Sequence, residues 1–498
     1  MNIIVRLYMC VISLHLFPLV FSMDSCSSSP LASPAVLLKA YCEQLYEFDG
    51  YCFLQDNHSY NQDFFKKLAM HCGTSVVNYD LFNNLLDGVI QLLEERYWEE
   101  FKCWPQSACC NYAGACVVPY KSIIIAMGDY HGSLHSLLRN VMRLRYLGLM
   151  DKHFRLNPDV KLVFLGDIGG RGFYSFELWT FILALMLCNP NNIIVLQGNH
   201  ETEALFSSDG SLYEFLAKLG DEEKVHECLR KMYYFFSLLP QTFFIGTRSS
   251  SYEPVHFIQF CHGGLSEYKE CKELSCGPKF FLKEMPWRKL LIGALYKKGA
   301  GACYFSYLQQ HFSQDNGLLW NSFYADDDPN APLVIEGGRD KFDLMHHGKA
   351  VYKYFSQLGY KGLFTVDALV RGHDHISCGV GRLTAYSFKN SDSYDADRVF
   401  LRIDKKDVIT RERLVSQYPV FTISSVAQMQ HCDAFAVLRY DAHMTYWSVV
   451  PYVYPLSFET LHGFHADDII LARKMLPPEK NKNFFYTDYK KIAHIIWP

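Results

Sequence analysis

The chain has 498 residues, of which 49% are hydrophobic and 20% are charged, so it can bury a large core and is not of the disordered class. Its formal net charge of −4 is too small to indicate a polyanion such as duplex DNA as a partner, and we expect no nucleic-acid partner. The length alone allows about two to four domains.

The first 22 residues are typical of a targeting segment. Arg6 precedes an apolar stretch, Leu7–Ser22, and Val20 and Ser22 occupy positions suited to cleavage. The stretch is shorter than the about 20 residues that a transmembrane helix needs. We predict a signal peptide or hydrophobic segment over 1–22 and a secreted or exported protein. Membrane attachment is expected only if the segment is retained, and a helix without a targeting role is the alternative.

Residues 23–34 are a linker rich in Ser and Pro. Residues 35–118 are predicted to form a helical module, because apolar residues recur at spacings of three and four, notably over Asn78–Phe101. Its cysteines lack the CxxC spacing of a zinc site. Oxidised pairs and buried free thiols both remain open for them.

From residue 119 onward, short apolar runs alternate with helical ones. Ser133–Leu147 and Ser175–Leu187 are predicted helices between strands, which indicates βαβ units and a mainly parallel first sheet. Ser211–Leu239 is predicted to be helical in two pieces, with Asp221 capping the second piece.

The later part of the chain is rich in predicted strands, which suggests a second sheet packed on the first. The predicted fold class is α/β, a two-sheet β-sandwich flanked by helices, with an N-terminal helical module and a helical insertion at about 268–316. The main domain is predicted over 119–455, followed by a C-terminal extension over 456–498. The four predicted late strands are Val399–Ile403, Val420–Ser424, Ala434–Tyr440 and Met444–Val453.

Five apolar runs each end in side chains that can bind a metal. The motifs are, in chain order, GDYHG, GDIGGRG, GNHE, HGG and RGHDH. One such motif is most often a turn, but the five together indicate a dinuclear metal site beyond the carboxyl ends of strands. The candidate ligands are Asp129, His131, Asp167, Asn199, His262 and His373.

These ligand types point to a particular chemistry. Asp129 and His131 are two residues apart, so both can face one side of an extended chain, and Asp167 can place one oxygen on each of two ions. Mixed oxygen and imidazole ligands suit Mn²⁺, Fe or Zn²⁺. Two such ions about 3.5–4 Å apart clamp the attacking and leaving oxygens of a phosphoryl displacement.

On these motifs, the chain resembles the calcineurin-like metallophosphoesterases and, within them, the phosphoprotein phosphatase (PPP) family of serine/threonine phosphatases. The resemblance covers about residues 121–452 and rests on the pattern GDxHG, GDxxDRG, GNHE, HGG and R-G/A-H. It implies two divalent metal ions, with Mn²⁺ favoured and Fe or Zn²⁺ as alternatives. It assigns Asp129, His131 and Asp167 to one ion, and Asp167, Asn199, His262 and His373 to the other.

The resemblance also implies catalytic roles. His200 would protonate the leaving oxygen, and Arg171 would hold phosphate oxygens by a bidentate contact. Arg339, ahead of a predicted helix, lies about where the family has its second phosphate arginine, with a surface salt bridge as the alternative.

The chain departs from the family pattern at Gly170, where the family has the aspartate that orients the catalytic histidine. His200 therefore needs another partner, for which Glu201 and Asp374 are candidates. The loss is compatible with aryl phosphates, because a phenolate leaves more readily than a serine alkoxide.

Two further departures lie late in the chain. RGHDH contains a second histidine, which in the wider superfamily's G-H-x-H pattern binds the first metal. His375 is therefore predicted as an extra ligand, with a structural histidine as the alternative. Residues 424–430 replace the family's Ser-Ala-Pro-Asn-Tyr loop, whose tyrosine would overhang the metals.

The sequence thus predicts a dinuclear-metal phosphomonoesterase that hydrolyses phosphoproteins, at serine/threonine or tyrosine, by attack of metal-bound hydroxide. One alternative is a phosphatase of dinucleoside polyphosphates or other small molecules. Another, suggested by Gly170, is a pseudophosphatase that binds phosphoproteins without hydrolysis. The predicted export signal and flanking segments also resemble secreted effector phosphatases of intracellular bacteria, which are delivered into a host cell.

Overall fold

The structure is a computed structural model. The predicted segments 1–22, 23–34 and 456–498 lie outside the residues that it describes, as does Arg339, so these remain predictions. All the described residues belong to one unit of the chain, Pro34–Pro498. They are 79–101, 112–172, 174–208, 211–265, 286–297, 299, 301–307, 317–324, 332, 334–336, 344–360, 362–375, 379–383, 388–389, 413–414, 420–425 and 432–455.

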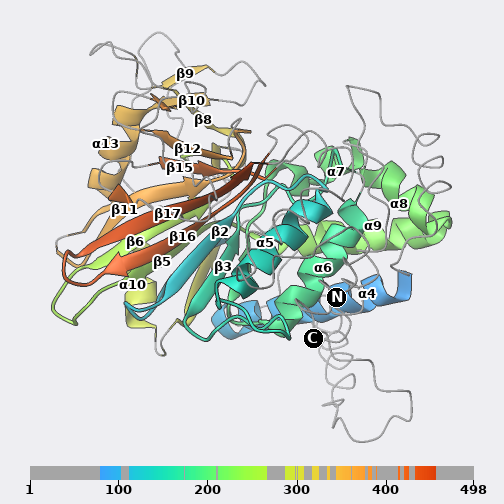
Figure 1. The fold of residues 1–498 in the computed structure, drawn as a ribbon, viewed down its shortest axis with the longest axis horizontal. Coiled ribbons are helices and arrows are strands. Elements are labelled where there is room, and N and C mark those ends of the chain that lie inside the picture. The colour runs from blue at the N-terminus through green and yellow to red at the C-terminus, as the bar shows by residue number, and fades with distance from the viewer. Residues whose placement is uncertain are drawn as a thin grey trace, which may run out of the picture. The chain divides into compact units, whose positions relative to one another are not determined.

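Among these residues, one sheet has six strands in the order β14-β17-β16-β2-β3-β4. Figure 1 shows β17, β16, β2 and β3 of this sheet side by side. Strands β2, β3 and β4 run parallel, as βαβ units require, whereas β16 is antiparallel to β2 and β17. The bounds are β2 (Ile123–Met127), β3 (Val160–Phe164), β4 (Ile193–Val195), β14 (Arg413–Leu414), β16 (Cys432–Asp441) and β17 (Tyr446–Pro455).

A second sheet of the described part has eight strands in the order β13-β12-β15-β11-β6-β5-β1-β7. Here β15, β11 and β6 are parallel, and β5 is antiparallel to β6. The bounds are β1 (Tyr112–Val117), β5 (Pro240–Thr247), β6 (Val255–Cys261), β7 (Cys303–Tyr307), β11 (Phe364–Arg371), β12 (Val380–Leu383), β13 (Phe388–Lys389) and β15 (Val420–Ile423).

The two sheets share one core, because neighbouring residues of the eight-stranded sheet face opposite sides. Ile258 belongs to the core that also contains β2 and β3, whereas Phe257 packs with α10 (Pro286–Tyr296) and α13 (Gly348–Leu358). One face of this sheet therefore meets the other sheet, and its opposite face is covered by two helices. This arrangement is the predicted sandwich flanked by helices.

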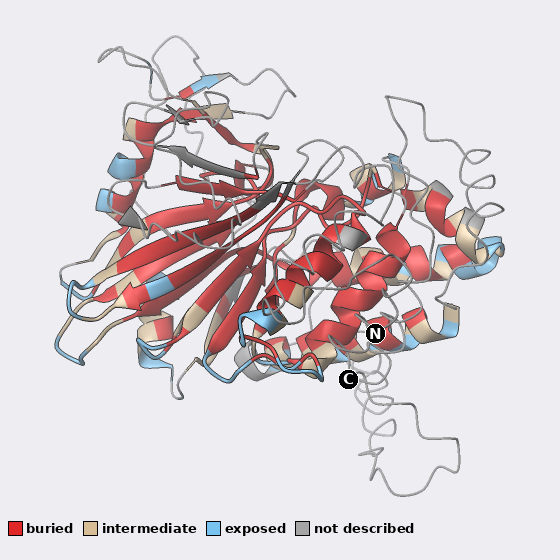
Figure 2. Ribbon diagram, in the orientation of Figure 1, coloured by how far each residue is buried: buried red, intermediate tan, exposed pale blue. Residues whose placement is uncertain are grey.

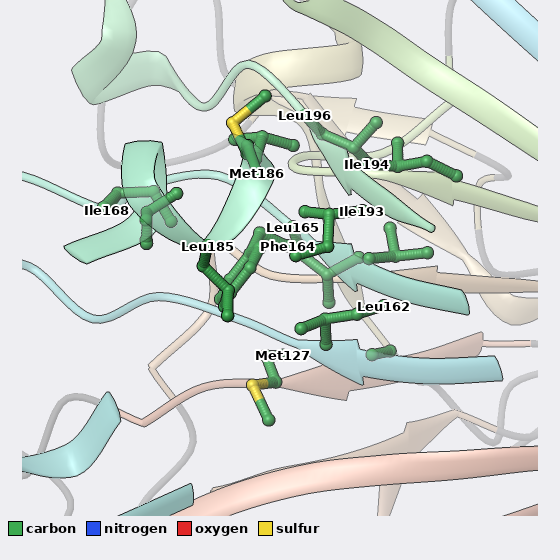
Figure 3. Close-up of a cluster of buried hydrophobic side chains, with 14 of the residues drawn as sticks. Met127, Leu162, Phe164, Leu165, Ile168, Leu185, Met186, Ile193, Ile194 and Leu196 are labelled. Carbon is green, nitrogen blue, oxygen red and sulfur yellow. The ribbon is translucent and has the colours of Figure 1, made fainter. Parts of the chain in front are cut away.

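Helices also cover the six-stranded sheet, and Figure 2 shows that α5 and α6 are largely buried. Figure 3 shows Leu185 and Met186 of α6 packed against side chains of β2, β3 and β4. Among the described residues, no helix has the length and apolar character to cross a membrane. The remaining bounds are α4 (Tyr79–Phe101), α5 (Leu134–Tyr146), α6 (Ser175–Cys188), η1 (Asn199–Glu201), α7 (Glu203–Ser208), α8 (Ser211–Leu219), α9 (Glu222–Ser237) and α12 (Gly317–Trp320).

A small three-stranded sheet completes the described strands, with β8 (Ser322–Tyr324), β10 (Leu344–His347) and β9 (Val334–Glu336) in that order. The helices predicted from periodicity are present as α4, α5, α6, α8 and α9. Asp221 caps α9 as predicted, because its side chain accepts from Lys224 N at 3.2 Å.

Two segments that are predicted to be helical each contain a strand. The predicted helical module 35–118 contains a strand, β1, and the predicted helical insertion 268–316 contains another, β7. These two strands pair with each other and lie in the eight-stranded sheet, where Cys116 and Cys303 stand opposite one another as free thiols. The small residues of β1 hide its strand character: a Cβ at Gly114 would lie 2.3 Å from the Phe243 ring.

The predicted second sheet from the tail strands is also wrong in its detail. Strand β15 joins the eight-stranded sheet, whereas β16 and β17 extend the parallel sheet beside β2. The predicted strand Val399–Ile403 lies outside the described residues. Sequence patterns show that a segment is a strand, but the pairing partner is decided by packing.

Candidate metal centre

The five motifs meet at one edge of the sandwich. Each follows the C-terminal end of a strand, namely β2, β3 and β4 of one sheet and β6 and β11 of the other. Parallel strands present their carboxyl ends at a common edge, so side chains that are distant in sequence converge there.

The loops that carry these side chains are tightly turned. Tyr130 N and His131 N both donate to Asp167 O, at 2.9 and 3.0 Å, which joins the first two motifs. Among the described non-glycine residues, most of those with positive φ lie in the motifs, and such backbone strain is concentrated at functional sites. They are Asp129 (26°), His131 (45°), Asp167 (51°), Arg171 (61°) and His373 (68°).

One group of possible ligands contains Asp129, His131 and His375. His375 Nε2 lies 2.9 Å from His131 Nε2 and 3.3 Å from Asp129 Oδ2. Asp167 joins this group, because its Oδ2 lies 3.4 Å from His131 Nε2. The second histidine of RGHDH therefore lies among the predicted ligands of the first ion.

A second group contains Asp167, His262 and His373. His262 Nε2 lies 3.2 Å from Asp167 Oδ2, 2.9 Å from Asn199 Oδ1 and 3.2 Å from His373 Nδ1. Asp167 Oδ2 is thus shared between the two groups, which is the arrangement expected of a bridging carboxylate. We call the seven residues Asp129, His131, Asp167, Asn199, His262, His373 and His375 the ligand cluster.

The ligand cluster has the chemistry of a cation site. The carboxylate of Asp129 is fully buried, and neither oxygen has a hydrogen-bond donor among the described residues. The amide of Asn199 also lies against His262 Nε2 and the Asp167 carboxylate. Burying charged and polar acceptors against one another is costly unless a cation lies among them. The residues therefore fit two divalent ions.

Electrostatics support the same assignment. Burial lowers the pKa of His131 and of His373 well below the usual range, so both imidazoles are neutral, as ligands must be. Burial also opposes charge on His262, but the carboxylates of Asp167 and Asp129 raise its pKa to about 9. A cation in the cluster would take over the place of that proton.

His200 and Arg171 adjoin the ligand cluster. Arg171 reaches His200 Nε2 and His375 Nδ1, each at 3.3 Å. His200 N donates to Asp167 Oδ1 at 3.0 Å, and its Nε2 lies 4.0 Å from Asp167 Oδ2. The imidazole of His200 thus lies next to the shared carboxylate, and the guanidinium of Arg171 lies next to the imidazoles of His200 and His375.

The two carboxylates predicted to orient His200 have other contacts. Glu201 Oε2 accepts from Asp167 N at 2.7 Å and Gly198 N at 2.9 Å, and its Oε1 accepts from Ile168 N at 2.9 Å. Glu201 therefore ties the GDIGGRG loop to the GNHE loop.

Asp374 forms an ion pair with Arg371 and accepts from Ser322 Oγ at 3.0 Å. The structure brings Arg171 and Asp167 to His200. That Glu201 or Asp374 orients His200 stays a prediction. Sequence reasoning missed the role of Glu201 as a link between loops, although its place in GNHE could have signalled it.

Comparison with known proteins places these motifs in a family. A family model described as calcineurin-like phosphoesterase matches residues 123–377, about half of the chain, and includes the whole ligand cluster. The serine/threonine-protein phosphatase 6 catalytic subunit of Caenorhabditis elegans is 35% identical over 124 residues. That match covers 25% of this chain and 33% of the relative, so the chain spans about a third of the relative's length.

Two solved structures are similar at lower identity. One is a protein serine/threonine phosphatase from Saccharomyces cerevisiae, described as similar to human phosphatase PP5, with 14% identity and a TM-score of 0.43 over 80% of this chain and 96% of that one. The other is a cold-active protein-tyrosine phosphatase of a psychrophilic Shewanella species, with 14% identity and a TM-score of 0.34 over 65% and 77% of the two chains.

Proposed function

The chain belongs to the calcineurin-like phosphoesterase family, and from that premise we propose that it is a metal-dependent phosphoprotein phosphatase of the PPP type. One observation carries the proposal: Asp167 is shared by two groups of ligand atoms, with Arg171 and His200 beside it. A shared carboxylate between two cation positions, with an arginine close by, suits a phosphate ester, because the ions and the guanidinium can both bind its oxygens.

The ligand cluster would hold two divalent ions, for which we propose Mn²⁺, with Fe or Zn²⁺ as alternatives. When bound, such ions withdraw charge from phosphoryl oxygens and make a water nucleophilic at neutral pH. The chain's own residues do the rest. Arg171 donates two N–H groups to the phosphate oxygens, and His200 holds the proton that the leaving oxygen takes.

The test of this function is Asp167→Asn, measured by bound metal and by phosphate release from phosphopeptides in added Mn²⁺. We expect loss of both, because the amide cannot supply two anionic oxygens. Asp441→Asn is the matched control, since the Asp441 side chain accepts from His443 N and Met444 N in the turn between β16 and β17 and is not part of the ligand cluster. Retained turnover by metal-free Asp167→Asn protein would disprove the proposal.

The substrate class needs its own experiment. Gly170 removes the family's histidine-orienting carboxylate, which favours either a good aryl leaving group or binding without hydrolysis. A panel of phosphoserine, phosphothreonine and phosphotyrosine peptides, with a dinucleoside tetraphosphate, separates these cases. Fastest turnover of phosphotyrosine supports aryl preference, and preferred cleavage of the dinucleotide supports the small-molecule alternative. Tight peptide binding without phosphate release supports the pseudophosphatase.

We also propose that the protein is exported, since residues 1–22 have the composition of a signal peptide. Delivery into a host cell as an effector remains a proposal of the same kind. Mass spectrometry of the N-terminus of the natural protein tests the first step. An uncleaved Met1 in a cell-associated protein would contradict export by a cleaved signal.

A further inference from the structure

The turn that carries Arg171 has a demanding backbone. Gly170 has φ 86° and Arg171 has φ 61°, so two successive residues lie in the left-handed region. Gly172 N donates to Gly170 O over 2.6 Å, which makes the turn tight. A non-glycine residue keeps such a conformation only where its surroundings hold it. The position of the guanidinium therefore depends on what fastens this turn.

The start of α6 fastens the turn. Gly170 N donates at 3.2 Å to the side-chain oxygen of Ser175, the first residue of α6. The first N–H groups of a helix need acceptors, and Tyr174 before the helix supplies no side-chain cap. Glu214 of α8 takes this place: its carboxylate accepts from Ser175 N at 3.1 Å and Phe176 N at 3.0 Å.

Glu214 is itself held by Lys218, one turn further along α8. Lys218 Nζ lies 2.7 Å from Glu214 Oε1 and also pairs with Glu177 of α6. Both glutamates are buried. Burial alone would lower the pKa of Lys218, but the two carboxylates raise it, so the ammonium stays charged between them. The three side chains join α8 to the end of α6 that follows the Arg171 turn.

We propose that Glu214 is a positioning residue for Arg171: it fixes the first turn of α6 and, through Ser175 Oγ, the Gly170–Arg171 turn. This role rests on the proposed function, because it takes Arg171 as the group that binds the substrate phosphate. It explains why a fully buried carboxylate from another helix caps α6 at this position.

The test measures binding of inorganic phosphate to Mn²⁺-loaded protein, by calorimetry and by inhibition of aryl phosphate hydrolysis. Glu214→Ala should weaken phosphate binding by about 10-fold, which is the lower end of the losses measured when residues that orient metal-binding side chains are replaced. Bound metal should be unchanged. Loss of metal in parallel with phosphate affinity would overturn the proposal, because it would show that the whole loop, including Asp167, had moved.

The decisive measurement repeats Glu214→Ala in an Arg171→Ala background. If Glu214 acts through Arg171, adding Glu214→Ala to the Arg171→Ala protein changes its phosphate affinity by less than about 2-fold, because the effects of coupled residues are not additive. An equal loss in both backgrounds would overturn the proposal. Glu214→Gln keeps the shape and one acceptor oxygen, and should give a smaller loss of about 3-fold. If Glu214→Ala does not fold, Glu214→Gln is measured in the wild-type and Arg171→Ala backgrounds instead.

Lys231→Met is the matched control. Lys231 of α9 contacts Asn83 Oδ1 and Asp87 Oδ2 of α4, both at 2.8 Å, and so joins two helices as Lys218 does. We expect a lower Tm with unchanged phosphate affinity, and an equal loss of affinity would overturn the specific role of Glu214. Wild-type protein that binds no phosphate in Mn²⁺ would contradict the proposed function itself. If the wild type binds phosphate and Glu214→Ala weakens binding equally with and without Arg171, only the role of Glu214 is contradicted.

Discussion

Two clusters of buried charge adjoin each other in this protein, and they are built in opposite ways. In the ligand cluster, the oxygens of Asp129 have no donor among the described residues. In the second, which we call the ion cluster (Arg139, Asn140, Arg143 and Asp433), every acceptor has a donor. The Asp433 carboxylate accepts hydrogen bonds from Arg139 Nε at 2.6 Å, Arg139 NH2 at 2.9 Å and Arg143 NH1 at 2.7 Å.

Both carboxylates are fully buried, so burial does not distinguish them. What differs is the partner of each carboxylate. Two guanidiniums donate hydrogen bonds to Asp433, whereas Asp129 has the imidazoles of His375 and His262 at 3.3 and 3.8 Å and no hydrogen-bond donor among the described residues. The two clusters are connected, because Ser425 N donates to Asp129 O at 3.0 Å and Asn140 Nδ2 lies 3.5 Å from Ser425 Oγ. The comparison teaches that a buried acid without a hydrogen-bond donor can mark a cation site, whereas one held by guanidiniums can be a structural brace.

The largest expected effect tests the first half of this comparison. Asp129→Asn removes one anionic ligand and should lower phosphatase activity by more than about 100-fold, above the range seen for groups that only support a ligand. In metal-free protein two buried carboxylates, Asp129 and Asp167, share the protonated imidazole of His262, so the charge of Asp129 is only partly compensated. Its removal should leave the free energy of unfolding equal or raise it. Activity assays and urea denaturation in chelator measure the two quantities. A lower stability of the metal-free variant would contradict the comparison.

The second prediction breaks the ion cluster. Asp433→Asn leaves two buried guanidiniums without their counter-charge and should lower the free energy of unfolding by about 3 kcal/mol, near the lower end of values for broken buried pairs. Denaturation with and without Mn²⁺ should show the same loss. Asp87→Asn is the control, because its partly exposed pair with Lys231 should contribute less than about 1 kcal/mol.

This brace also predicts a pH dependence. Burial opposes ionisation of Asp433, but Arg139 and Arg143 hold its pKa below the usual value. A carboxyl with a lowered folded pKa contributes stability above its unfolded pKa of about 3.9, and loses it as pH falls through the folded pKa. Wild-type stability should therefore fall more steeply below about pH 4 than that of Asp433→Asn. Parallel curves for the two proteins would count against the brace.

The third largest effect is the loss of stability when metal is removed. Divalent ions that bind only the folded state stabilise it by about 2.7 kcal/mol when the free ion is at 100 times its Kd. A chelator should abolish this stabilisation in the wild type, which is measured as a lower Tm. The stabilisation should persist in Asp433→Asn and be reduced or lost in Asp129→Asn. An Asp129→Asn protein that responds fully to the chelator would remove Asp129 from the ligand cluster.

The smallest effect concerns the link between the clusters. Asn140 accepts from Arg143 NH1 at 2.7 Å and donates to Tyr130 OH at 3.0 Å. Asn140→Ala should lower the free energy of unfolding by about 1 kcal/mol, the net contribution of a typical hydrogen bond. Bound metal, measured by elemental analysis, should be unchanged. Loss of metal in this variant would show that the two clusters depend on each other.

Much of the site was readable from sequence because its signals are local. An apolar run that ends in glycine and an acid or histidine defines both a buried strand and a polar loop at its carboxyl end, and five such runs yielded the ligand cluster. Gly198 shows how strict this local pattern is, since a Cβ there would lie 2.3 Å from Asp167 Oδ1. Helix periodicity and the Asp221 cap were readable for the same reason.

Other features depended on partners far away in the chain. The pairing of β1 with β7, and the division of β15, β16 and β17 between two sheets, follow from long-range packing that no local pattern contains. Asp433 and Glu214 carry no motif either. Each resembles an ordinary surface acid until the fold places it against guanidiniums or a helix start.

The sequence by itself therefore predicted the residues of the ligand cluster and the chemistry that they can support, because ligand type and strand-end position are local properties. The tertiary structure decided which side chains contact His200 and Arg171, and which buried acids lack a hydrogen-bond donor among the described residues. Those outcomes depend on distances between side chains from different strands and helices, and only the packed fold sets such distances.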